Sequence, residues 1–118
     1  MRWRTVCRLA GQLPEVLHGT SYGTPVLAVR GSFMARLTDD RRSVLVKAED
    51  DERLSLCASN PRTFSPGGPT WNGTTVAVRL AAVEPQEMWD VLVSAWRRSA
   101  PPSLVAEVDP STLWRRAR

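Results

Sequence analysis

Apolar residues recur at intervals of three and four near the start of the chain, and this spacing predicts an amphipathic helix over residues 2–13. The apolar face of this helix would carry Trp3, Val6, Cys7, Ala10 and Leu13. Pro14 follows directly and would end the helix, because proline cannot donate the hydrogen bond that a helix interior requires. We expect Trp3 to pack against the core.

Alternating apolar and polar residues then predict strands with one face on the core. The alternation runs through residues 27–37, interrupted by a hairpin loop at residues 30–32, and returns at residues 44–48 and 76–80. Residues 19–25 contain two glycines and are predicted to form a shaped loop that leads into the first strand. We therefore expect a β-meander followed by one later strand.

Helices are predicted between and after these strands. Acidic residues at 49–52 precede a short helix that Asn60 and Pro61 would end. A loop follows at residues 66–69, where glycine and proline gather. The main core helix is predicted to start at residues 84–87, with a proline and a carboxylate in its first turn, and to end before a pair of prolines. A short helix would run from Ser103 through Val108.

The alternation of strands and helices in 118 residues predicts a single α+β domain, built on an antiparallel sheet of about four to five strands. We place this domain at residues 1–109 and a basic C-terminal tail at residues 110–118. No apolar run reaches the length of a membrane span, and the first residues lack the apolar segment of a secretory signal. We therefore expect a cytoplasmic protein whose two separated cysteines stay reduced.

Charge allows a polyanionic partner without requiring one, since the net charge is +4. If Leu27 pairs with Ala35, and Ala35 with Val46, the strands carry a second face opposite the core. That face would bear Met34, Arg36, Leu45, Lys47 and Arg79. Cationic side chains around apolar ones suit the phosphates and bases of nucleic acid, but a simple solvated strand face has the same pattern. A register error of one residue would exchange the two faces.

Catalytic motifs are sparse, so we expect no enzymatic activity, no cofactor and no metal site. His18 is the only histidine, and the chain has neither a nucleophile elbow nor a phosphate-binding loop. Trp71 stands between a glycine-proline segment and an Asn-Gly pair, where it could be at the tip of a hairpin or folded over the sheet edge. For Tyr22 we expect a ring packed beneath its loop, with the hydroxyl bonded to backbone.

Several segments in this order resemble the MmcQ/YjbR family. They are Leu13-Pro14-Glu15-Val16, Gly19-Thr20-Ser21-Tyr22-Gly23-Thr24-Pro25, Phe33-Met34-Ala35-Arg36-Leu37, Val78-Arg79-Leu80 and Ala95-Trp96. The resemblance implies a CyaY-like (frataxin-like) arrangement with helices on one face of the sheet, and a DNA-binding function with a "double wing" of hairpins. The chain departs from the family at Pro69-Thr70-Trp71, where the family tends to have a His-Tyr pair. Frataxin-like iron binding is not expected, because residues 2–13 lack acidic side chains.

Two hypotheses follow. In the first, the protein binds DNA: Arg36, Lys47 and Arg79 neutralise phosphates. Arg30, Arg41 and Arg42 on hairpin loops would extend this footprint, and Trp71 or Tyr22 would stack on bases. In the second, the chain is a small-molecule binding or resistance protein, with weak catalysis as an option. Its ligand would bind between residues 19–25 and 67–71, in contact with His18, Tyr22 and Trp71. A flat cationic surface favours the first hypothesis, and an enclosed pocket between the loops favours the second.

Overall fold

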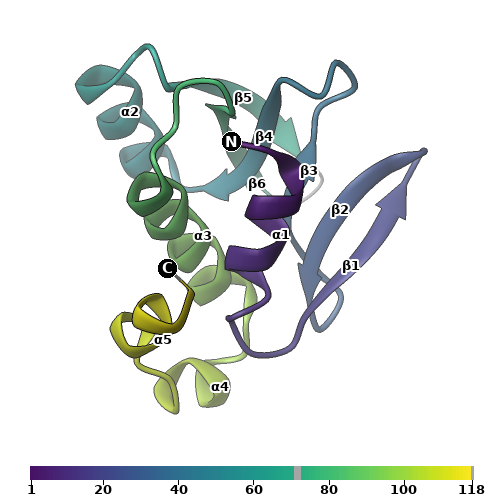
Figure 1. Ribbon diagram of the computed structural model, residues 1–118, viewed down its shortest axis with the longest axis vertical. Helices are drawn as coiled ribbons and strands as arrows, with labels where there is room; N and C mark the ends of the chain where they lie inside the picture. The colour runs from purple at the N-terminus through teal and green to yellow at the C-terminus, as the bar shows by residue number, and fades with distance from the viewer. Residues whose placement is uncertain (71–72, 118) are drawn as a thin grey trace.

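The computed structural model describes residues 1–70 and 73–117, which form an α+β domain around one six-stranded antiparallel sheet. The strands lie in the order β1-β2-β3-β4-β6-β5 (Figure 1). They are β1 (Val16–Ser21), β2 (Thr24–Val29), β3 (Ser32–Leu37), β4 (Ser43–Ala48), β5 (Phe64–Thr70) and β6 (Gly73–Arg79). The helices are α1 (Trp3–Ala10), α2 (Asp50–Ser59), α3 (Pro85–Ser99), α4 (Pro102–Ala106) and α5 (Pro110–Ala117).

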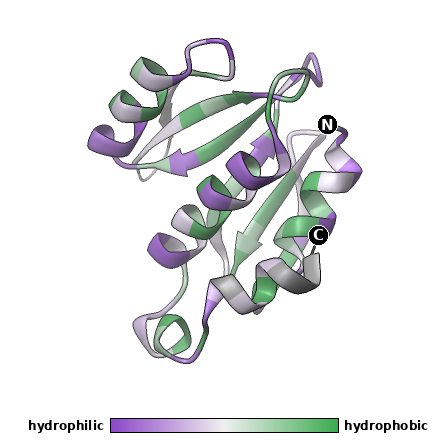
Figure 2. Cartoon of the chain, turned by 60° about the vertical axis from the view of Figure 1, so that its left-hand side comes forward, coloured by the Kyte–Doolittle hydropathy of each residue, from purple (hydrophilic) through white to green (hydrophobic). Residues whose placement is uncertain are grey.

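Helices α1, α2 and α3 pack on the same side of the sheet (Figure 1). Between α3 and the sheet lies a fully buried layer that includes Leu27, Ala35 and Val46. These residues are neighbours through the register predicted from the sequence, Leu27 opposite Ala35 and Ala35 opposite Val46. Figure 2 shows the apolar residues concentrated along the central strands and on the inner surfaces of the helices. The predicted fold class is confirmed.

Two strands were not predicted, because both lie at the edges of the sheet. Residues 19–25, expected to be a loop, form the end of β1, a tight turn and the start of β2. Tyr22 and Gly23 have φ values of 52° and 82°, the pair of positive angles that a two-residue hairpin turn needs. Residues 66–69, also expected to be a loop, belong to β5. An edge strand tolerates proline because one side of its backbone needs no ladder partner.

A bulge in β3 corrects the prediction for Met34. Leu27 pairs with Ala35 but Ala28 pairs with Phe33, so Met34 is an extra residue in the ladder. Its side chain turns into the core and is fully buried, whereas strict alternation predicts it on the opposite face. The opposite face therefore carries Leu45 but not Met34.

Helix α3 is fixed to the rest of the domain by side-chain hydrogen bonds at both ends. At its start, the Glu87 carboxylate accepts the Glu84 backbone N–H at 2.9 Å and the Asn60 amide at 3.0 Å. Near its end, Trp96 donates to the Pro14 carbonyl at 2.9 Å, and Ser99 donates to the Phe33 carbonyl at 2.9 Å. These bonds set α3, and with it α1, over the sheet.

The helix boundaries differ from the predictions at both ends of the chain. Helix α1 ends at Ala10 and is followed by Gly11, so the chain leaves the helix before Pro14. Residues 110–117, predicted as a tail, form α5 instead. The Trp114 ring lies 5.7 Å from the Trp89 ring, centroid to centroid, so an aromatic contact holds α5 on α3.

Candidate nucleic-acid interface

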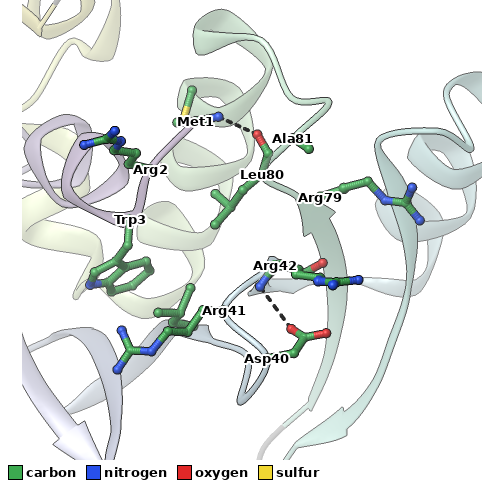
Figure 3. A pocket seen from close by; sticks show the side chains of 11 residues that line it. Met1, Arg2, Trp3, Asp40, Arg41, Arg42, Arg79, Leu80 and Ala81 are labelled. Atoms are coloured by element: carbon green, nitrogen blue, oxygen red, sulfur yellow. Dashed lines mark hydrogen bonds between the residues drawn. The ribbon is translucent and has the colours of Figure 1, made fainter.

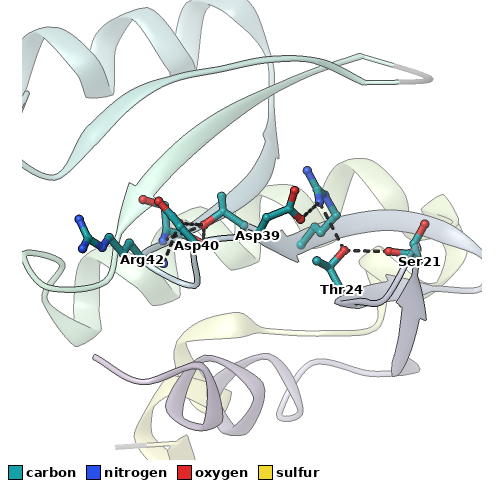
Figure 4. Close-up of polar contacts among 8 residues, drawn as sticks. Ser21, Thr24, Asp39, Asp40 and Arg42 are labelled. Atoms are coloured by element: carbon teal, nitrogen blue, oxygen red, sulfur yellow. Dashed lines mark hydrogen bonds and ion pairs between the residues drawn. The ribbon is translucent and has the colours of Figure 1, made fainter.

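The turn between β3 and β4 presents two adjacent arginines, and its conformation is held by its own side chains. The Thr38 hydroxyl donates to the Asp40 carboxylate at 2.6 Å, and Asp40 also accepts the Arg42 backbone N–H at 3.0 Å (Figure 4). Arg41, between them, has a φ of 61°, a left-handed conformation that costs free energy for a residue with a side chain. The hydrogen bonds of the turn offset this cost and project both arginines from the end of the sheet.

The Asp40 carboxylate is engaged by hydrogen bonds within its own turn. The Thr38 hydroxyl and the Arg42 backbone N–H stabilise its charged form, and they lower the pKa of the Asp40 carboxyl below its ordinary value. The carboxylate oxygen that accepts both bonds faces its own turn. Asp40 thus stays ionised at neutral pH and serves to shape the turn.

The turn borders a cleft of about 840 Å³ with four arginines on its walls. Arg79, the last residue of β6, lies beside the turn because it pairs with Ser43 across β4 and β6. Figure 3 shows Arg42 and Arg79 extending in the same direction, while Arg41 lies on the other side of the cleft next to Trp3. Arg2 comes from the N-terminal segment, which is tethered where the Met1 nitrogen donates to the Leu80 carbonyl.

These arginines have no ion-pair partner among residues 1–70 and 73–117. Four other arginines do form ion pairs with described residues: Arg30, Arg36, Arg53 and Arg98. Asp40 is the single acidic residue on the described walls of the cleft, and its carboxylate bonds the backbone of the turn. We name Arg2, Arg41, Arg42 and Arg79 the arginine cluster. The charge of Asp40 acts on Arg42 at longer range, but the four guanidinium groups outnumber this one carboxylate. The cleft is therefore a favourable place for an anion.

Two of the predicted phosphate ligands are already engaged. Arg30 forms a two-pronged contact with Glu15, at 2.9 Å and 2.7 Å. This contact raises the pKa of the Arg30 guanidinium and lowers that of the Glu15 carboxyl. Arg36 lies 3.6 Å from Asp39 and 3.3 Å from the Thr24 hydroxyl, as part of the polar contacts in Figure 4. Arg30 also lies at the opposite end of the sheet from Arg41, because the β2–β3 and β3–β4 turns point in opposite directions.

The predicted basic sheet face is present, but fewer of its side chains are free than the sequence predicted. Arg36 pairs with Leu45, and Lys47 pairs with Thr75, so both cations lie on the face opposite the helices. Lys47 is half-buried and forms no ion pair with a described residue. Arg79 lies on the same face, because it alternates with the buried Val78 and pairs with Ser43. Among the described residues the sheet face thus offers two cations without an ion pair, Lys47 and Arg79, and Arg79 also belongs to the arginine cluster.

The structure does not bring together the two loops of the predicted small-molecule site. His18 and Tyr22 belong to the β1–β2 hairpin, and residues 67–70 belong to β5, so the two groups occupy opposite edges of the sheet. Tyr22 is fully exposed at the tip of its hairpin, contrary to the expectation of a packed ring. His18 is exposed as well. Trp71 lies outside the described residues.

Potential metal ligands and thiols lie apart from one another among the described residues. No three histidine, cysteine or acidic side chains gather there into a possible metal site. Cys7 and Cys57 are free and partly buried, and burial raises the pKa of the Cys7 thiol. No helix among the described residues has the length and apolar character that crossing a bilayer requires.

Trp3 packs against the core, as predicted. Sequence reasoning missed Arg2, and it did not indicate that Trp3 also borders this cleft. The helical spacing of residues 2–13 indicates which side of α1 is apolar, but not which part of the sheet its first turn meets. The shape of the β3–β4 turn was easier to predict from the sequence. Threonine and aspartate side chains in a polar turn, here Thr38 and Asp40, commonly form hydrogen bonds with the backbone of that turn.

The architecture and the arginine cluster together define a class: an α+β domain with helices on one face of an antiparallel sheet and a cationic cleft at one end. Among solved structures, the chain is similar to protein DR2400 of Deinococcus radiodurans, which contains a DUF419 domain, the MmcQ/YjbR family. The two share 17% sequence identity with a TM-score of 0.71, over 90% of this chain and 86% of that chain. The match confirms, at the level of the fold, the resemblance seen in the sequence. No family model and no curated protein matches the sequence.

Proposed function

We propose that this protein is a non-enzymatic DNA-binding protein that contacts the phosphate backbone through the arginine cluster. The observation that supports the proposal is the gathering of Arg2, Arg41, Arg42 and Arg79 around one cleft, none with an ion-pair partner among the described residues. Guanidinium groups bind phosphate oxygens through paired hydrogen bonds and keep their charge at every physiological pH.

The location of the cluster suits a long polyanion. Arg42 and Arg79 extend to one side of the cleft and Arg41 to the other (Figure 3), so a single small anion would engage only part of the set. A nucleic-acid backbone carries successive phosphates and can contact both sides. Lys47 on the sheet face would add a more distant contact. Backbone contacts of this type carry little sequence information.

The test is fluorescence anisotropy of labelled DNA across a salt series. Phosphate binding releases counterions, so the logarithm of the affinity should fall linearly with the logarithm of the salt concentration. The double variant Arg41→Glu/Arg42→Glu should abolish binding, because it places carboxylates where phosphates would lie. Both side chains are exposed, so the variant should remain folded.

A matched control separates the cluster from general charge. Arg62→Glu/Arg97→Glu makes the same change in net charge at two exposed arginines outside the cluster. This variant should keep most of the affinity. Equal losses in the two double variants would reduce the interaction to net charge, and no binding by the wild-type protein at low salt would refute the proposal.

A further inference from the structure

Trp3 lies on the wall of the same cleft, and this position bears on the kind of nucleic acid that fits. The ring is partly buried against the core and is next to Arg41 (Figure 3). Its indole N–H makes no hydrogen bond to any described residue. Trp3 is less enclosed than the two tryptophans of the core, Trp89 and Trp96, which are almost completely buried, so part of its ring is open to the cleft.

We propose that the cleft binds an unpaired nucleotide of a single strand, with the base beside Trp3 and flanking phosphates on the arginine cluster. This inference rests on the proposed function and narrows it. A base in a duplex is stacked on both faces, so its ring cannot reach an aromatic side chain in a wall. An unpaired base exposes a face, and stacking on tryptophan requires no particular base.

The arrangement of the cluster agrees with this assignment. Arg41 and Trp3 form one side of the cleft and Arg42 and Arg79 another (Figure 3), so a strand crossing it would meet an aromatic ring beside one cationic side chain and two further cationic side chains across the cleft. Interleaved aromatic and cationic groups are the usual composition of surfaces that bind single strands. The volume of about 840 Å³ is within the range of clefts that bind organic ligands of nucleotide size.

The primary experiment compares three labelled DNA probes with the wild-type protein: an oligothymidine strand, an abasic strand of equal length and charge, and a duplex of equal length. The oligothymidine should bind about tenfold more tightly than the abasic strand, because only the oligothymidine has bases that can stack on Trp3. It should also bind more tightly than the duplex. Equal affinities for the oligothymidine and the abasic strand would overturn the inference while leaving phosphate binding intact. No salt-sensitive binding of any probe would refute the proposed function itself.

Two variants test Trp3 directly. Trp3→Leu keeps an apolar side chain against the core and should lower affinity for the oligothymidine about tenfold, with affinity for the abasic strand unchanged. Trp3→Phe retains an aromatic face and should restore most of the lost affinity. Comparable losses for both strands would contradict a stacking role. If Trp3→Leu does not fold, the comparison of oligothymidine with abasic strand on the wild-type protein decides the question.

Competition separates a strand from a free nucleotide, since both offer a base and a phosphate. Thymidine monophosphate has one phosphate and cannot contact both sides of the cluster, so it should not displace the oligothymidine at equal nucleotide concentration. Displacement at that concentration would overturn the assignment to a strand and identify a mononucleotide site.

Discussion

Trp96 and Pro14 are joined by a hydrogen bond that connects α3 to the segment between α1 and β1. The indole N–H donates to the Pro14 carbonyl oxygen at 2.9 Å, and the Trp96 side chain is fully buried. Because α1 packs against α3, this bond fixes the course of the chain as it leaves α1 and enters the sheet.

Replacing Trp96 with phenylalanine should lower the free energy of unfolding by about 2 kcal/mol, because it leaves a cavity and a partly buried carbonyl without its donor. Urea denaturation provides the measurement. Trp89→Phe is a suitable control: it removes the same atoms from the same helix, but Trp89 makes no hydrogen bond through its indole to a described residue. Equal destabilisation by the two variants would show that the bond to Pro14 contributes nothing of its own.

Gly67 should not accept a side chain. A Cβ atom at this position would lie 2.3 Å from the Thr75 hydroxyl oxygen and 2.9 Å from the Thr75 carbonyl oxygen, where β5 bulges over β6. We expect Gly67→Ala to cost about 1–3 kcal/mol of unfolding free energy in a thermal or urea melt. Gly19→Ala is the control, since a Cβ there meets nothing within 4 Å. A neutral Gly67→Ala would contradict the close packing of these strands.

The contact of Trp114 with Trp89 should determine whether α5 stays docked. Trp114→Ala removes an aromatic pair and is expected to cost about 1 kcal/mol. Amide hydrogen exchange should accelerate in residues 110–117 and remain slow in the central strands, because no other α5 side chain forms an aromatic contact with α3 in the described structure. Trp114→Phe should exchange like the wild type, and uniform acceleration throughout the domain would argue against local undocking.

Asp40 gives the β3–β4 turn a dependence on pH. Its pKa is lower in the folded protein than the ordinary value of 3.8, so the stabilisation by its carboxylate is fully present above that value and is lost as the pH falls through the folded-state pKa. Asp40→Asn should therefore be less stable than the wild type at neutral pH, with the difference closing below pH 3.8. Urea midpoints over a pH series measure this difference in stability. If it stayed constant with pH, the ionisation of the Asp40 carboxyl would not be its cause.

Arg30 and Arg79 should differ in their effect on DNA binding. Arg79→Ala is expected to weaken binding equally for all sequences and to lower the slope of affinity against salt by about one. Arg30→Ala should leave both quantities unchanged, because Glu15 already neutralises Arg30. A larger loss for Arg30→Ala would place the binding surface at the other end of the sheet.

The central strands and the main helix could be predicted because each buries one continuous apolar face. Strands β1 and β5 could not be predicted, because alternation is a signature of burial on one face. The residues of β1 are largely exposed, and β5 contains prolines, which an edge strand tolerates, and glycines, which are uncommon in strands. The bulge at Met34 could not be predicted either. A methionine side chain is compatible with either face of the sheet, and only the pairing of Ala28 with Phe33 shows which face this side chain occupies.

Three of the four residues of the arginine cluster were predicted from the sequence, but Arg2 and the arrangement of the cluster were not. Arg41, Arg42 and Arg79 are evident as cations on a turn and a strand, yet their proximity depends on the pairing of β4 with β6. The exclusion of Arg30 depends on Glu15, which comes close only because β1 pairs with β2. Long-range pairings of this kind have no local sequence signal.

The pairing of Ser43 with Arg79 also has a consequence for folding. The turn that bears Arg41 and Arg42 is complete once β3 and β4 form a hairpin, but Arg79 joins it only after the chain has passed through α2 and β5 and returned as β6. A fragment ending at residue 48 would have the turn without the full cluster. The proposed binding to the full cluster would therefore require the finished sheet. A bound strand should then raise the unfolding temperature of the protein, as any ligand that recognises only the native state does.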